Sequence, residues 1–390
     1  MKFKRIFVIV LDSLGVGEAL DASNYGDVGA CTLGHINKEH ELFIPNLTKL
    51  GFLNTMNMSN NPDTEGYYTM ARPTNKGKDT LSGHYEIMGV RCQYSFPTFM
   101  DNGFPSELIS EIEKYTGRGV IGNVAMSGTE IIKVLGERHM KTGELIIYTS
   151  SDSVLQVAAH ENIIPLEELY KICEIIRKIT MSREEWMVGR IIARPFKGAF
   201  SDNFVRTHNR RDFSINPPMK SVLEKLEDNK LSVISIGKIY DIFNGKGITK
   251  KITSAGNKDG VDKILDIMDK KFTGLCFANL NDFDTLYGHR RDSLGYARAI
   301  EEFDVEIPMI LNKLNNDDLL IITADHGNDP TYKGTDHTRE NVPVLIYSRL
   351  FKEPKMLPIM NTFADIGATI ADNFDVDMPM IGISYMNELK

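Results

Sequence analysis

Acids and histidines gather in the last third of this 390-residue chain. Asp284 and His289 stand in one segment, Asp325 and His326 in a second, and His337 follows shortly after. Carboxylate oxygen together with imidazole nitrogen suits divalent manganese, iron or zinc. A single Asp–His pair on a loop is usually structural. Two such segments with a third histidine nearby instead indicate a metal site.

Two short apolar runs precede these segments and must position them. Residues 319–322 are too few for a helix and follow four Asn and Asp residues, so they predict a buried strand. Asp325 and His326 leave its carboxyl end. Residues 275–280 form a similar run that leads to Asp284 and His289. In open α/β sheets ligands bind beyond the carboxyl ends of the strands, where both segments would then meet.

A third strand is expected near the start of the chain, over residues 7–11. Gly15 and Gly17 after it could begin a dinucleotide-binding fingerprint, but Leu20 stands where the third glycine belongs. Asp12 directly follows the strand. If this strand is central in a parallel sheet, the Asp12 carboxylate points into the same crevice as the acids and histidines of the last third. The alternative is that Asp12 caps a turn or helix.

Residues 77–86 contain hydroxyl groups at the predicted start of a helix. Asp79 or Thr80 could cap the helix that the apolar residues 81, 87 and 88 indicate. A helix N-terminus favours an anion, so a hydroxyl at this place is well set to carry a phosphate. The simpler role for Thr80 is that of the N-cap alone. Ser82 is a competing nucleophile.

The middle of the chain follows another pattern and predicts an inserted domain. Helices are expected from Ser106 and after Pro165, and strands over residues 120–124, 145–148 and 187–192. The Asn-Pro-Pro segment at 216–218 resembles a return linker before a strand at 231–236. We therefore expect a core over residues 1–96 and 215–390, with an insertion over residues 97–214.

Charged groups in this insertion suit a phosphorylated ligand. Its later part holds five arginines, Arg190, Arg194, Arg206, Arg210 and Arg211. Guanidinium can hold a phosphate through two hydrogen bonds. The segment Ser151-Asp152-Ser153 offers hydroxyls and a carboxylate for sugar hydroxyls. For any single arginine the alternative is a solvated surface charge.

Composition limits the class of protein. The net charge of −8 arises from 45 basic and 53 acidic residues without a long basic tract, which argues against general nucleic-acid binding. No stretch approaches the roughly 18 apolar residues of a membrane span. The apolar run 6–11 is shorter than the hydrophobic region of a signal peptide. The four cysteines are widely spaced and fit reduced thiols, so we expect a cytoplasmic protein that binds neither membranes nor nucleic acid.

Taken in order, the motifs resemble those of one known family. They are Asp12 after the first strand, Thr80 in K-D-T-L-S-G-H, Asp284 and His289 in D-F-D-T-L-Y-G-H-R-R, Asp325 and His326 in T-A-D-H-G-N-D, and His337 in T-D-H-T-R-E. This set resembles the phosphopentomutase family of the alkaline phosphatase superfamily over essentially the whole chain. The resemblance implies an α/β fold with a doubly wound, mostly parallel sheet. It also implies two bound divalent metal ions, usually manganese, and a smaller α/β cap domain inserted into the core.

The resemblance further implies roles for individual residues. It places Asp12, Asp325 and His326 on one metal, Asp284, His289 and His337 on the other, Thr80 as the phosphorylated residue, and Asp152, Arg190, Arg206 and Lys238 on the substrate. The implied activity is an isomerase that interconverts ribose 1-phosphate and ribose 5-phosphate, or the deoxyribose pair. The route would use a phosphothreonine and a pentose 1,5-bisphosphate.

Three alternatives stay open at the level of sequence. A metal-dependent phosphatase or phosphodiesterase would use the same ligands but release phosphate to water. A cofactor-independent phosphoglycerate mutase would act on a three-carbon acid, and it resembles this chain less well because it is longer and uses a serine nucleophile. A non-catalytic sugar-phosphate binder would have no need for a hydroxyl at position 80.

Overall fold

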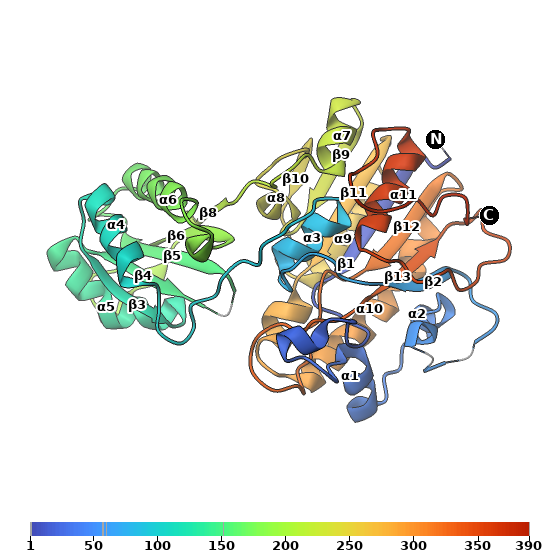
Figure 1. Ribbon diagram of the computed structural model, residues 1–390, viewed down its shortest axis with the longest axis horizontal. Helices are drawn as coiled ribbons and strands as arrows, with labels where there is room; N and C mark the ends of the chain where they lie inside the picture. The colour runs from blue at the N-terminus through green and yellow to red at the C-terminus, as the bar shows by residue number, and fades with distance from the viewer. Residues whose placement is uncertain (1, 57, 60, 151, 390) are drawn as a thin grey trace. The chain divides into compact units, whose positions relative to one another are not determined.

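The computed structural model describes residues 2–56, 58–59, 61–150 and 152–389, and the chain divides into two compact units (Figure 1). The first unit comprises residues 1–95 and 216–390, and the second comprises residues 96–215. The sequence-based boundaries, 96/97 and 214/215, lie one residue from these. The roles of core and cap remain predictions.

A seven-stranded sheet forms the centre of the first unit. Its order is β10-β9-β11-β1-β12-β13-β2, in which the first five strands run parallel and the last two pair antiparallel. The strands are β1 (Arg5–Leu11), β2 (Tyr67–Ala71), β9 (Ser232–Ile236), β10 (Lys250–Ile252), β11 (Gly274–Leu280), β12 (Asp318–Thr323) and β13 (Val342–Tyr347). Every residue of β1, β11 and β12 is buried. This explains their continuous apolar runs, because a parallel sheet is covered on both faces.

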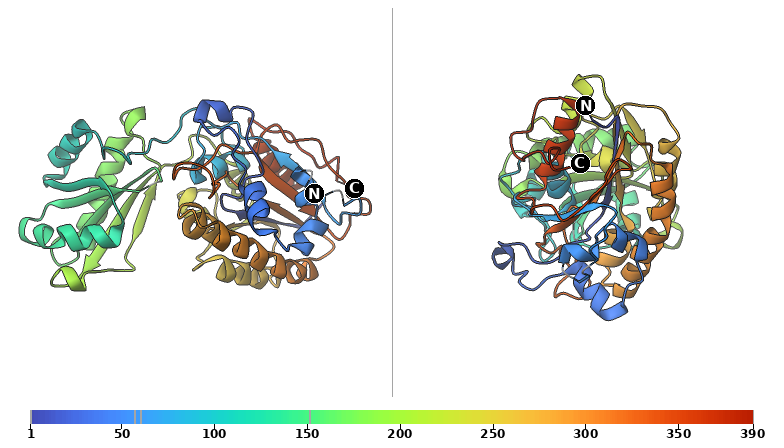
Figure 2. Two further views of the ribbon diagram at one scale, coloured as in Figure 1. Left: turned by 90° about the horizontal axis from the view of Figure 1, so that it is seen from below. Right: turned by 90° about the vertical axis from the view of Figure 1, so that its right-hand side faces the viewer.

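Helices cover both faces of this sheet. In the right-hand view of Figure 2 the orange helix α10 (Ser293–Lys313) and the red helix α11 (Ala364–Phe374) lie on opposite sides of it. The other helices of the first unit are α1 (Thr32–His40), α2 (Pro45–Lys49), α3 (Thr80–Ile87), α7 (Val222–Asp228), α8 (Ile239–Ile242) and α9 (Asn257–Met268). The predicted α/β class with a doubly wound, mostly parallel sheet is confirmed. Within the described ranges, no helix has both the length and the apolar character needed to cross a membrane.

The register of the central strands brings three loops to one edge of the sheet. Leu11 of β1 pairs with Leu280 of β11, and Val10 pairs with Thr323 of β12. The three strands are parallel and end side by side. The segments that follow them therefore leave the same carboxyl edge, which is where α/β sheets bind ligands.

The second unit is a smaller α/β layer structure. Its sheet has the order β3-β4-β5-β6-β7, and β8 also pairs with β6. The elements are α4 (Ser106–Thr116), β3 (Val120–Ala125), α5 (Gly128–Thr142), β4 (Leu145–Thr149), β5 (Val154–His160), α6 (Leu166–Thr180), β6 (Arg190–Lys197), β7 (Val205–Arg206) and β8 (Arg211–Ser214). Apolar residues of α4 and α6 pack with one set of alternating strand residues. Those of α5 pack with the other set, on the opposite face.

One strand prediction in this unit was wrong in its bounds. The strand expected over residues 187–192 begins only at Arg190 and continues to Lys197. The Arg177 guanidinium accounts for the late start, because it donates to the carbonyl oxygens of Val188 at 2.7 Å and Gly189 at 3.2 Å. The Val188 carbonyl thus serves a buried side chain, while the Gly189 carbonyl also accepts from the backbone N–H of Ile215 at 3.0 Å, just after β8.

Candidate metal centre

The first group of potential ligands joins the two ends of the chain. Asp12 follows β1, while Asp325 and His326 follow β12, and their ligand atoms lie within 4.8 Å of one another. His326 Nε2 lies 3.5 Å from Asp12 Oδ1 and 3.4 Å from Asp325 Oδ2. All three side chains are buried. The adjacent strand ends thus place two carboxylates and one imidazole around a common point.

The donor atoms of this group fit a divalent cation. Asp12 Oδ1 and Asp325 Oδ2 are buried and accept no hydrogen bond from any residue that the structure describes. A buried carboxylate oxygen without a hydrogen-bond donor is costly, so these two oxygens favour a cation between them. His326 Nδ1 faces the Gly327 carbonyl oxygen at 3.1 Å and donates to it. This tautomer directs the lone pair of Nε2 toward the carboxylates, as in many metal-bound histidines.

Without a cation, a proton takes its place in this group. Burial disfavours the imidazolium, but the Asp325 and Asp12 carboxylates outweigh burial and raise the pKa of His326 to about 10. Burial likewise works against ionisation of Asp325, but His326 and His84 lower its pKa to about 2. A metal ion therefore has to displace a proton from His326, and metal affinity should rise with pH.

The second group contains Asp284, His289 and His337. Asp284 lies in the π-helical turn η5 (Phe283–Gly288) that follows β11, and His289 ends that turn. His289 Nε2 lies 3.1 Å from Asp284 Oδ2 and 3.2 Å from His337 Nε2, while His337 Nε2 lies 3.5 Å from Asp284 Oδ1. Burial opposes ionisation of Asp284, yet the two imidazoles hold its pKa well below the usual range. Two imidazole nitrogens directed at each other beside a carboxylate are suited to share a cation.

The two groups adjoin each other. The ring centroids of His326, from the first group, and His337, from the second, are 4.1 Å apart. The structure therefore brings all of the predicted ligands into one place in the first unit: Asp12, Asp284, His289, Asp325, His326 and His337. An arrangement of two neighbouring cation sites is the one that phosphoryl-transfer enzymes with two metals use.

Residues that the sequence analysis did not single out hold these ligands in place. Asn328 Nδ2 donates to Asp284 Oδ1 at 2.8 Å, and Asn328 Oδ1 in turn accepts from Arg291 at 2.7 Å. Asn279 Nδ2 donates to Asp12 Oδ2 at 3.1 Å. A signal for Asn279 was available, since it is a polar residue inside the apolar run of β11. Asn328 and Arg291 lie in loops that offer no such contrast.

Thr80 presents its hydroxyl to the first group. Thr80 begins α3, is 8% exposed, and its Oγ1 lies 3.3 Å from His326 Nε2. The N-cap of α3 is Asp79, whose carboxylate accepts from the backbone of Leu81 and Ser82. Ser82 Oγ donates to the same carboxylate at 2.7 Å. Thr80 is thus relieved of the capping role, and the competing hydroxyl of Ser82 is engaged by the cap.

A glycine permits α3 to approach the metal ligands this closely. A Cβ atom on Gly83 would lie 2.0 Å from the Asp325 carbonyl oxygen, so no other residue fits there without displacing backbone. One residue further, His84 Nδ1 donates to the Thr80 carbonyl oxygen at 2.8 Å and lies 3.1 Å from Asp325 Oδ2. The buried imidazole therefore ties the first turn of α3 to the loop after β12.

The residues predicted to bind substrate fall into the two units. In the first unit Lys238, just before α8, places Nζ 3.1 Å from Asp12 Oδ2 and so adjoins the first ligand group. In the second unit Arg190 Nη2 donates to Asp152 Oδ2 at 2.7 Å, and Arg206 ends β7. Ser151, which the sequence analysis also named, lies outside the described residues.

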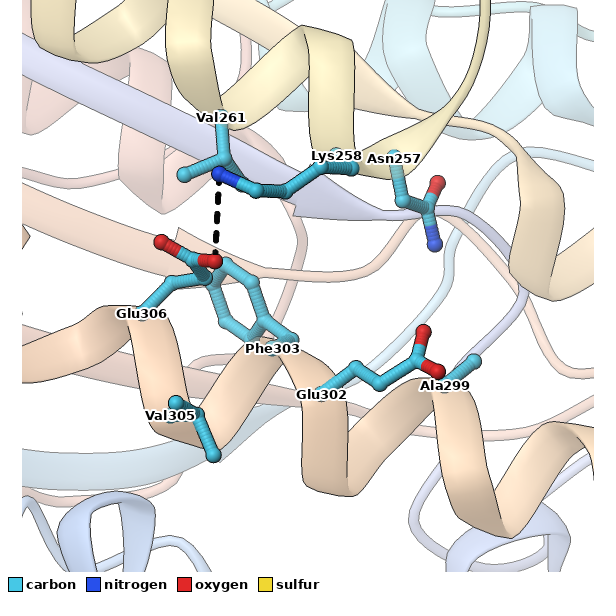
Figure 3. Close-up of a pocket in the computed structure, with 8 residues that line it drawn as sticks. All are labelled: Asn257, Lys258, Val261, Ala299, Glu302, Phe303, Val305 and Glu306. Atoms are coloured by element: carbon cyan, nitrogen blue, oxygen red, sulfur yellow. Dashed lines mark ion pairs between the residues drawn. The ribbon is translucent and has the colours of Figure 1, made fainter.

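A separate groove lies between α9 and α10 in the first unit (Figure 3). Its volume is about 410 Å³, and Lys258 Nζ lies 3.3 Å from Glu306 Oε1 across it. The lining residues are Asn257, Lys258, Val261, Ala299, Glu302, Phe303, Val305 and Glu306. None of these is a predicted ligand, so we assign the chemistry to the strand ends and not to this groove.

Several solved structures are similar to this chain, and one known family matches it. A structure of Leishmania mexicana phosphoglycerate mutase at low cobalt concentration matches with a TM-score of 0.50 and 12% identity, over 98% of this chain and 97% of the other. The PH0037 protein of Pyrococcus horikoshii gives a TM-score of 0.47 and 17% identity, over 89% and 88% of the two chains. A protein of the alkaline phosphatase superfamily from Vibrio parahaemolyticus gives a TM-score of 0.45 and 12% identity, over 99% of this chain and 70% of the other. At such identities the likeness concerns the fold alone. The chain matches the Metalloenzyme superfamily over residues 4–378, and it belongs to that superfamily.

Proposed function

We propose that this protein is a phosphopentomutase that interconverts the 1- and 5-phosphates of ribose or deoxyribose. The observation that carries the proposal is the Thr80 hydroxyl, 3.3 Å from His326 Nε2 at the start of a helix. A protein that merely binds metal or sugar phosphate has no use for a hydroxyl there. The positive end of the α3 dipole also favours the negative charge of a phosphorylated residue 80.

The side chains around Thr80 support a role as phosphoryl carrier. Two divalent cations, most suitably Mn²⁺, would activate the hydroxyl and neutralise phosphoryl oxygens when bound to the two ligand groups. His84 holds the Thr80 carbonyl and thereby orients the residue. The Lys238 ammonium group pairs with Asp12 and can turn toward a phosphoryl oxygen. The His84 contact restricts the position of Thr80, as transfer requires.

The proposed reaction proceeds in two transfers. Phosphothreonine 80 gives its phosphoryl group to the free hydroxyl of a pentose monophosphate. The new P–O bond forms as the bond to Thr80 Oγ1 breaks, and the proton of the attacking hydroxyl is balanced by the proton that Thr80 Oγ1 takes up. The resulting 1,5-bisphosphate then returns its other phosphoryl group to Thr80. We assign Asp152, Arg190 and Arg206 of the second unit to the sugar and its phosphate, because guanidinium pairs with phosphate through two hydrogen bonds.

The test is to incubate the manganese-loaded protein with ribose 1-phosphate and to follow all phosphorus species by ³¹P NMR. We expect ribose 5-phosphate to accumulate with little inorganic phosphate, and a trace of pentose bisphosphate should accelerate the reaction. Release of inorganic phosphate alone would assign a phosphatase. Tight binding without turnover would assign a binding protein. Conversion of 3-phosphoglycerate but not of pentose phosphates would assign a phosphoglycerate mutase.

A further inference from the structure

Ser13, which directly follows the candidate ligand Asp12, has a backbone conformation that is unusual for its residue type. Its φ angle is 74°, in the left-handed region that glycine adopts freely and other residues adopt at a cost. Glu41 and Asp375 share this region, but they are exposed and end the helices α1 and α11. Ser13 is fully buried, in a turn after β1. Buried strain of this kind gathers at functional sites, where the surrounding contacts maintain it.

The backbone of Ser13 serves both ligand groups. Its N–H donates to Asp325 Oδ1 at 3.0 Å, in the first group. Its carbonyl oxygen accepts from the Asn328 N–H at 3.1 Å, and the Asn328 side chain donates to Asp284 of the second group at 2.8 Å. A change in this backbone would therefore displace a ligand of one group and the support of a ligand in the other.

Tyr296 on α10 holds the turn in place. Its Oη lies 2.9 Å from Ser13 Oγ and donates to the Asp12 carbonyl oxygen at 3.4 Å, so the Ser13 hydroxyl is the donor in the shorter contact. The Tyr296 ring packs against Phe283 and Tyr287 of the turn η5, with centroids 5.8 and 6.4 Å away. Tyr296 is fully buried. One side chain thus braces the turn after β1 and the turn after β11, which carry ligands of different groups.

We propose that Ser13 and Tyr296 are positioning residues that set the geometry of the two cation sites together. The left-handed turn directs the Ser13 N–H to one group and its carbonyl to the other, and the Tyr296 hydroxyl keeps the turn from relaxing. Both side chains act through the residues that they hold. The proposal concerns the metal centre, so it does not depend on which phosphate ester is the substrate.

Titration of the full-length protein with Mn²⁺ after chelation tests the proposal. Calorimetry gives the dissociation constants of both sites, and electron paramagnetic resonance counts the unbound ion. We expect Ser13→Ala and Tyr296→Phe each to raise both dissociation constants roughly tenfold or more, as loss of an outer contact to a metal ligand does. The double variant should bind no more weakly than the weaker single variant, because both substitutions remove the same hydrogen bond.

A third variant tests the backbone conformation separately from the hydroxyl. Ser13→Gly and Ser13→Ala both lack the hydroxyl, but only glycine adopts a positive φ without strain. We therefore expect Ser13→Gly to bind Mn²⁺ more tightly than Ser13→Ala. At a residue with ordinary φ the order would be the reverse, because glycine makes the chain more flexible.

Two substitutions elsewhere in the first unit are matched controls. Lys230 has a φ of 59°, is exposed, and precedes the amino end of β9, so Lys230→Ala changes a left-handed residue far from the carboxyl edge. Tyr385 is buried and its Oη donates to the Ile359 carbonyl oxygen at 3.4 Å, so Tyr385→Phe removes a comparable hydrogen bond. Any effect of either should fall on the melting temperature and leave both Mn²⁺ dissociation constants unchanged.

Three results would overturn the proposal or a part of it. Lower melting temperatures with unchanged dissociation constants in Ser13→Ala and Tyr296→Phe would show that the pair only stabilises the fold. Weakening of a single site would refute the link between the two groups. Equal or weaker binding by Ser13→Gly than by Ser13→Ala would refute the role of the left-handed turn. If Ser13→Ala does not fold, Tyr296→Phe still decides whether both sites depend on the pair.

Discussion

Thr80 Oγ1 lies 3.3 Å from His326 Nε2, although 246 residues separate the two in sequence. The contact joins the start of α3 to the loop after β12, and Gly83 makes it possible by letting the helix touch the backbone of Asp325. A hydroxyl beside a metal-type imidazole is the relationship from which the proposed chemistry derives.

Replacing Thr80 with alanine should abolish phosphoryl transfer and phosphate labelling of the protein. After incubation with manganese and a pentose bisphosphate, mass spectrometry of the peptide with residue 80 should show a phosphate in the natural protein and none in the variant. Thr80→Ser should keep a measurable fraction of both. Ser82→Ala is the control, because the Ser82 hydroxyl is bound to Asp79, and its peptide should still be labelled. Label retained in Thr80→Ala would move the role to another residue.

Removing metal should lower the melting temperature. Asp12 Oδ1 and Asp325 Oδ2 are buried and accept no hydrogen bond from the described residues. A bound metal ion would offset their negative charge, which water does not reach. A ligand at a hundred times its dissociation constant stabilises the folded state by about 2.7 kcal/mol. Calorimetric melting with and without chelator, followed by return of Mn²⁺, measures the effect. Asp12→Asn should show a much smaller response to Mn²⁺ than the natural protein. Asp317→Asn, at a surface ion pair with Lys4, should respond like the natural protein.

Gly83→Ala should destabilise the protein even though alanine is the better helix former. The new Cβ would lie 2.0 Å from a backbone oxygen of Asp325, which cannot move without disturbing a ligand. Overpacking of this kind costs about 1–3 kcal/mol in the free energy of unfolding. Urea denaturation measures the cost, and titration with Mn²⁺ should show weakened affinity. Gly260→Ala in α9 is the control, since its nearest neighbour is the flexible end of Leu280. Equal stability of the two variants would contradict the tight approach of α3.

Acid should weaken the second unit through Glu161. Burial opposes ionisation of this carboxylate, but hydrogen bonds from Thr207 and Asn209 and the Lys197 ammonium lower its pKa from 4.5 to about 2. A depressed carboxyl pKa contributes stability that is complete above pH 4.5 and is lost as the pH falls from 4.5 toward 2. Glu161→Gln should therefore lower stability at neutral pH and flatten its pH dependence in that window. Hydrogen exchange of β5 and β6 amides at several pH values measures this.

The control for the acid experiment is Glu111→Gln on α4. Glu111 forms an exposed pair with Lys114 at 3.3 Å, of the kind that contributes little to stability. Its exchange profile should follow the natural protein throughout. A Glu161→Gln variant with the same slope as the natural protein would show that the hydrogen bonds to Thr207 and Asn209 do not hold the carboxylate ionised.

Much of the fold could be predicted because its central strands are apolar on both faces. The runs before Asp12, Asp284 and Asp325 became β1, β11 and β12, and the acids follow their carboxyl ends as expected. The start of β6 could not be predicted, because the Arg177 guanidinium of α6 donates hydrogen bonds to the carbonyl oxygens of residues 188 and 189. The contacts of Asn328 with Asp284 and Arg291 could not be predicted either, because side chains in loops follow no periodic pattern.

By itself the sequence indicated which segments are strands, which residues are candidates for metal-binding and nucleophilic chemistry, and the family that their order resembles. The tertiary structure decided which of these residues meet. Strand order in the sheet is not chain order, so β1 lies between β11 and β12 and Asp12 joins ligands more than 300 residues away. It also distinguishes the two hydroxyls on α3, because the Ser82 hydroxyl is hydrogen-bonded to Asp79 while the Thr80 hydroxyl faces His326. Such choices depend on distances across the packed core, which local residue patterns do not encode.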